Sequence, residues 1–114
     1  SSPASFAYSD NVKEVKEYFK SYPSIKVVKG SIPRVLNLIP EKPIAFLHVD
    51  LNNAKAEYAA LRKLQSRLMP GAIIVFDDYG GFGGSDQALV HEKFANENRK
   101  DLLTLPTGQA IIIW

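Results

Sequence analysis

The sequence contains no cysteine, which excludes disulfide bonds, thiolate zinc sites and a catalytic thiol. It has no apolar run near the ~20 residues that a membrane-spanning helix needs. Its first ten residues lack the basic segment and the long apolar segment of a secretory signal peptide. The net charge is only +2, and acids and bases are interleaved, so no basic surface for nucleic acid or acidic lipid is indicated. We therefore expect a soluble, cytoplasmic protein with neither a nucleic-acid nor a membrane partner.

The composition that remains is that of a folded globular protein. Hydrophobic residues make up 46% of the chain and charged residues 23%, which excludes a disordered or fibrous polypeptide. A chain of 114 residues can bury roughly 65% of its unfolded surface. We therefore expect a single domain over residues 1–114.

Four segments have the residue spacing of helices. In each segment, a residue that can cap a helix precedes apolar positions three or four residues apart. Proline or glycine follows the end of most of these segments. The expected helices are 11–21, a short one with Pro33 in its first turn that ends near Ile39, one that opens at Asn52 or Asn53 and stops at Pro70 and Gly71, and one from Ser85 or Asp86 to about Asn98.

Short β-branched and apolar runs alternate with these helices. Residues 25–29 predict a strand that Gly30 ends, and 44–49 and 72–76 are typical of strands buried on both faces of a parallel sheet. The final run, 102–114, contains a Pro-Thr-Gly turn and predicts an antiparallel hairpin. The order predicts an α/β domain with a mostly parallel sheet, helices on both faces and a C-terminal antiparallel hairpin.

Three carboxylates follow two of the expected strands. Asp50 ends the first apolar run, and Asp77 and Asp78 end the second. In open α/β sheets, ligands bind at this edge. Two like charges ~4 Å apart repel by roughly 4 kcal/mol at an effective dielectric of ~20, so the cluster needs a cation or a raised pKa. Hard oxygen ligands favour Mg²⁺, with Ca²⁺ and Mn²⁺ as alternatives, and such a site activates a substrate hydroxyl. The competing interpretation is that these aspartates only form turns or cap helices.

Histidines and glycines near these positions have plainer interpretations. His48 lies within an apolar run and is expected to be a core histidine rather than a catalytic base, and His91 is expected on a solvated helix face. Glycines in 80–84 do not form a phosphate loop, because no Gly-Lys-Ser/Thr follows. We expect a flap there, in which Tyr79 and Phe82 either face the substrate or pack within the loop.

Motifs at these strand ends resemble those of a known enzyme family. LHVD at 47–50, PG at 70–71 and DDYG at 77–80 are similar to the pattern of the macrocin-type sugar O-methyltransferases, a metal-dependent branch of the class I S-adenosylmethionine-dependent methyltransferases. The resemblance covers roughly 11–114 and implies a Rossmann-like fold. It implies that Asp50, Asp77 and Asp78 are Mg²⁺ ligands, and that Asp50 lies near the substrate hydroxyl as a proton acceptor.

The resemblance also assigns a cofactor position and reveals two departures. Gly30 and Ser31 correspond to residues that approach the adenine of S-adenosylmethionine. Asn52 and Asn53 stand near a position where the family has an acid, and no glycine precedes Gly30. The chain therefore resembles a C-terminal half that lacks the first strands of the family's sheet and part of the cofactor pocket. Exposed sheet edges would then favour a homo-oligomer formed by strand pairing.

The leading hypothesis is a metal-dependent S-adenosylmethionine O-methyltransferase that acts on a hydroxyl of a sugar or other small molecule. The incomplete pocket leaves open whether this chain is active alone. One alternative is a non-catalytic α/β domain that serves in assembly. A less favoured one is a Mg²⁺-dependent phosphotransferase with Asp50 as nucleophile, in which Asn52 breaks the usual Asp-x-Asp spacing. No motif identifies the acceptor.

Overall fold

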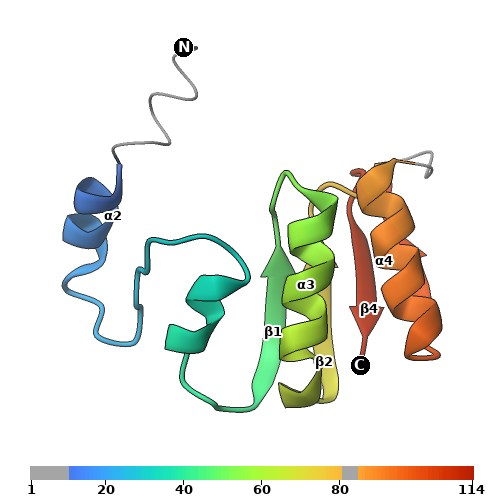
Figure 1. Ribbon diagram of the computed structural model, residues 1–114, viewed down its shortest axis with the longest axis horizontal. Helices are drawn as coiled ribbons and strands as arrows, with labels where there is room; N and C mark the ends of the chain where they lie inside the picture. Colours follow the sequence, from blue (N-terminus) through green and yellow to red (C-terminus); the bar gives the residue numbers. More distant parts are fainter. Residues whose placement is uncertain (1–10, 81–84) are drawn as a thin grey trace. The chain divides into compact units, whose positions relative to one another are not determined.

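The computed structural model describes residues 11–80 and 85–114 and divides the chain into two compact units, Ser1–Ser31 and Ile32–Trp114 (Figure 1). Whether these units form one domain, as the sequence suggests, stays a prediction. No helix among the described residues is both long and apolar enough to cross a membrane.

Within the described residues of the first unit, 11–31, the one helix is α2 (Val12–Phe19), which starts after Asn11 close to its expected position. The strand expected at 25–29 is wrong, because these residues have no regular secondary structure. A strand persists only where a neighbour pairs with its backbone N–H and C=O groups. The part of this unit that the structure describes, 11–31, contains no such neighbour, and Ile25 and Val28 are exposed.

The second unit holds all the described strands. Its elements are η1 (Arg34–Leu38), β1 (Ile44–Val49), α3 (Ala54–Leu64), η2 (Gln65–Arg67), β2 (Leu68–Phe76), α4 (Asp86–Glu97), β3 (Leu102–Thr104) and β4 (Ala110–Ile113). The sheet has the order β1-β2-β4-β3; β1 and β2 are parallel, and both other pairs are antiparallel. This confirms the α/β class and the C-terminal hairpin. The sheet is mixed rather than mostly parallel, because 25–29 do not add a strand.

Local chemistry explains where the helices begin and end. Asn53 Oδ1 accepts the Ala56 N–H at 2.9 Å at the start of α3, and Ser85 Oγ accepts the Ala88 N–H at 3.0 Å at the start of α4. The expectation that α3 extends to Pro70 is wrong, because its α-helical part ends at Leu64 and β2 already begins at Leu68.

The core lies between the sheet and the two long helices, which cover the same face of the sheet (Figure 1). Ile74 and Phe76 on β2 are fully buried, whereas Ile73, directly before Ile74, is 40% exposed, and Phe46 on β1 is 62% exposed. The strands therefore alternate, and the expectation that 44–49 and 72–76 are buried on both faces is wrong. The reason is that α3 and α4 leave the second face uncovered within residues 32–80 and 85–114.

Candidate metal centre

The register of β1 and β2 brings the three aspartates together. Val49 lies opposite Phe76 in the parallel pair, and the Asp77 N–H donates to the Val49 carbonyl at 3.0 Å. One carboxylate oxygen from each of Asp50, Asp77 and Asp78 lies within 4.8 Å of the others. The expected convergence at one rim is thus observed, and the metal-binding role of the cluster stays a prediction.

Two side chains that are not carboxylates contact Asp77. Gln109 Nε2 donates to Asp77 Oδ1 at 2.9 Å, and His48 Nε2 lies 3.6 Å from the same oxygen. The His48 side chain is 47% exposed, so its interpretation as a core histidine is wrong: it points to the uncovered face of the sheet. Gln109 was not predicted as a site residue from the sequence. Its position beside the Pro-Thr-Gly turn is only a weak signal for a site residue. The antiparallel pairing of β4 with β2, which brings Gln109 to Asp77, has to be known first.

The electrostatics of the cluster favour a cation. Desolvation raises the pKa of Asp78, and the neighbouring Asp50 carboxylate raises it further, with smaller contributions from Asp77 and Glu57. Negative charge accumulated at one rim in this way is relieved by a divalent ion. Carboxylate oxygens are the hard ligands that Mg²⁺ prefers. The residues present therefore fit the magnesium site that the sequence suggests.

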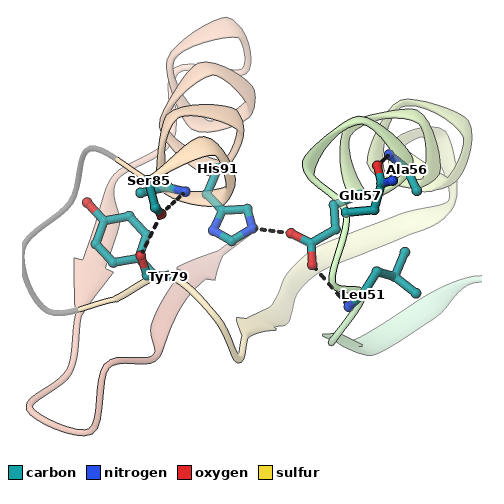
Figure 2. A network of polar contacts seen from close by, with 8 residues as sticks. Leu51, Ala56, Glu57, Tyr79, Ser85 and His91 are labelled. Carbon is teal, nitrogen blue, oxygen red and sulfur yellow. Dashed lines mark hydrogen bonds and ion pairs between the residues drawn. The ribbon is translucent and has the colours of Figure 1, made fainter. Parts of the chain in front are cut away.

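Glu57 on α3 and His91 on α4 form a fully buried pair of polar side chains that contacts residues next to the aspartates (Figure 2). His91 Nε2 and Glu57 Oε1 are 2.6 Å apart, and Glu57 Oε2 accepts the Leu51 N–H at 3.0 Å. The expectation that His91 faces solvent is wrong, because this face of α4 packs on the sheet, where the imidazole stacks on Phe76. Glu57 was not singled out from the sequence, although it stands four residues before Leu61 and shares its apolar stripe.

Tyr79, the residue after the two adjacent aspartates, packs against α4. Tyr79 is 7% exposed, and its hydroxyl donates to Glu92 Oε1 at 2.6 Å. This hydrogen bond is the main cause of the raised pKa of Tyr79. Of the two roles considered for Tyr79, packing is the one observed, and the ring packs into the core beside α4. Phe82 and the glycines at 81, 83 and 84 lie outside the described residues.

The remaining site residues lie elsewhere. Gly30 and Ser31 belong to the first unit, where both are exposed and outside regular secondary structure. An open cleft of about 640 Å³ lies between the starts of α3 and α4 and is lined by polar groups that include Asn52, Asn53 and Gln87. This cleft borders the loop that carries Asp50.

Comparison with known proteins identifies the family. A family model described as "Methyltransferase domain" matches residues 3–79. The chain belongs to the methyltransferase domain family. The match ends just after Asp77 and Asp78, so it includes the three aspartates that cluster at the rim of this methyltransferase domain. The methyltransferase resemblance seen in the sequence is thereby confirmed.

Solved structures show the same fold. One is titled as the apo structure of CalS11, TDP-rhamnose 3'-O-methyltransferase, an enzyme in calicheamicin biosynthesis; it is 24% identical, with a TM-score of 0.65. The match covers 98% of this chain and 51% of that one. A second structure, of CalS11 described as a calicheamicin methyltransferase, is 22% identical, with a TM-score of 0.60. This match covers 98% of this chain and 46% of that one. The methyltransferase domain thus spans about half the length of these neighbours. A comparison with curated proteins found no match.

Proposed function

We propose that this methyltransferase domain takes part in the transfer of a methyl group from S-adenosylmethionine to a hydroxyl of a sugar or other small molecule, with Mg²⁺ held by Asp50, Asp77 and Asp78. The observation that carries the proposal is the approach of three carboxylates within 4.8 Å at the strand ends of a methyltransferase-family chain. The sugar acceptor is suggested by the structural neighbour described as a TDP-rhamnose 3'-O-methyltransferase.

Each residue of the cluster has a part in the proposed chemistry. When bound, Mg²⁺ supplies Lewis-acid activation of a hydroxyl oxygen. Asp50 is exposed and takes the hydroxyl proton while the new O–C bond forms and the C–S bond of the methyl donor breaks. Gln109 fixes the orientation of Asp77 by donating to one of its oxygens. The cleft beside Asn52 and Asn53 gives the acceptor access to this rim.

The donor site of the proposal rests on the sequence resemblance. Gly30 and Ser31 are the residues proposed to approach the adenine of S-adenosylmethionine. Both residues are exposed, which leaves them accessible to a ligand.

Calorimetric titration tests the metal and the cofactor separately. We expect saturable Mg²⁺ binding that Asp77→Asn abolishes, whereas Asp101→Asn, which removes an exposed acid outside the cluster, leaves it unchanged. We then expect S-adenosylmethionine to bind to the Mg²⁺-loaded protein. Equal Mg²⁺ binding by the wild type and Asp77→Asn would contradict the metal centre. Mg²⁺ binding without any cofactor binding would contradict catalysis by this chain.

One observation favours the non-catalytic alternative, a domain that serves in assembly. Residues 25–29, which lead to Gly30, do not form the strand that would position the cofactor loop. The same domain would associate through a sheet edge, and β1 and β3 are the edge strands of the sheet formed by the described residues. Light scattering that finds dimers, together with no binding of S-adenosylmethionine, would favour this alternative. Monomers that bind the cofactor would oppose it.

A further inference from the structure

The buried Glu57–His91 pair contacts both chain segments that carry the aspartates (Figure 2). On one side, Glu57 Oε2 accepts the N–H of Leu51, the residue directly after Asp50. On the other side, the His91 ring stacks on Phe76, the residue directly before Asp77, with ring centroids 4.0 Å apart and planes at 22°. One pair of side chains therefore spans the ends of β1 and β2.

The next residue along α4 extends this contact. Glu92 accepts the hydroxyl of Tyr79, which directly follows Asp78, and the Tyr79 ring lies 6.1 Å from the His91 ring. The chain on both sides of the adjacent aspartates is thus held by α4, while the chain after Asp50 is held by α3.

From these contacts we infer that Glu57 and His91 are positioning residues: the pair fixes the chain that carries Asp50 relative to the chain that carries Asp77 and Asp78, and thereby sets the affinity of the cluster for a divalent cation. The inference rests on the proposed metal centre. Neither side chain touches the cation, the donor or the acceptor; both act through the backbone.

Energetics support a role beyond stability. Replacing a buried ionic or hydrogen-bonded pair by apolar residues of similar size is often neutral or stabilising, so packing alone gives little reason for Glu57 and His91 at fully buried positions. The pair also leaves His91 Nδ1 buried without a partner among the described residues, which is a further cost. Three mutually repelling carboxylates, by contrast, hold a cation-binding geometry only if their backbones are fixed.

The test measures binding of Mn²⁺ alone by electron paramagnetic resonance, together with thermal unfolding of each variant. Glu57→Leu combined with His91→Leu replaces the pair by an apolar contact. We expect it to stay folded and to bind Mn²⁺ about 10–100-fold more weakly than the wild type. Should this double variant unfold, Glu57→Met combined with His91→Met is the substitute, because two flexible apolar side chains fill the space without accepting the Leu51 N–H or pairing with each other by a hydrogen bond, and the same weakening is expected.

Two further variants separate positioning from general packing. Tyr58→Phe removes another hydrogen bond between the same two helices, from the Tyr58 hydroxyl to Glu97, and should leave Mn²⁺ affinity unchanged. His91→Gln places an amide nitrogen near the site of Nε2 and should retain most of the affinity.

The outcomes distinguish the inference from the function on which it rests. Wild-type Mn²⁺ affinity in the folded double variant would overturn the inference and leave the metal centre standing. Equal weakening by Tyr58→Phe would overturn it as well, since the effect would then reflect helix packing. Absence of Mn²⁺ binding by the wild type would overturn both the metal centre and the inference.

Discussion

Replacing Asp78 by asparagine should stabilise the metal-free protein and abolish its stabilisation by Mg²⁺. The reason is that the Asp78 carboxylate lies within 4.8 Å of both Asp50 and Asp77. At that distance, two unit charges repel by about 0.9 kcal/mol in water and about 3.5 kcal/mol at an effective dielectric of ~20. The cluster lies at an exposed rim, so solvent screening puts each pair near the lower value, about 1 kcal/mol.

Removing one charge from two such pairs should therefore raise the free energy of unfolding of the metal-free protein by about 1–2 kcal/mol, or its Tm by about 4–8 °C. Thermal unfolding at pH 7 and low salt in the presence of a chelator measures this. With Mg²⁺ at 100 times its Kd, the wild type should gain about 2.7 kcal/mol and the variant nothing, so that the order of stability reverses.

Acid provides the control for this prediction. The pKa of Asp78 is raised in the folded protein, so its contribution to stability is fully present below the ordinary value of 3.8 and is lost as pH rises through the folded pKa. The advantage of Asp78→Asn should accordingly vanish below that pH and be complete at neutral pH. An Asp78→Asn protein that is no more stable than the wild type at pH 7 in chelator would refute the reasoning.

Three stability predictions follow from single contacts and can be checked by urea unfolding. Asn53→Ala removes the cap of α3 and should cost about 1 kcal/mol, whereas Asn52→Ala should cost much less. Tyr79→Phe leaves Glu92 without its hydrogen bond and should cost about 1–2 kcal/mol. Gly108→Ala should cost about 1–2 kcal/mol through backbone strain alone, because φ is +87° and no atom lies within 4 Å of the added methyl group. A loss below a few tenths of a kcal/mol in any of the three would contradict its explanation.

Local sequence signals predicted much of the second unit. The apolar run of β1, the caps of α3 and α4 and the turn of the hairpin act over a few residues, and each formed where it was expected. The three aspartates were predictable as a cluster for the same reason, since the carboxyl ends of parallel strands meet at one edge.

Features that depend on packing between distant segments could not be read in the same way. The apolar residues of β1 and β2 do not reveal that α3 and α4 both lie on one face of the sheet. This arrangement leaves Phe46 and His48 exposed on the other face. Residues 25–29 have the composition of a strand but no partner within the described part of their unit. Glu57 and His91 are polar residues in amphipathic helices, and only the contact between α3 and α4 shows that each buries the other.

The most direct test of the account is the position of a bound cation. Crystals grown with Mn²⁺ and measured for anomalous scattering should show one strong peak in contact with the carboxylates of Asp50, Asp77 and Asp78, and Asp77→Asn crystals should lack it. A wild-type crystal saturated with Mn²⁺ that shows no peak at this rim, or a peak bound by other residues, would contradict the central claim.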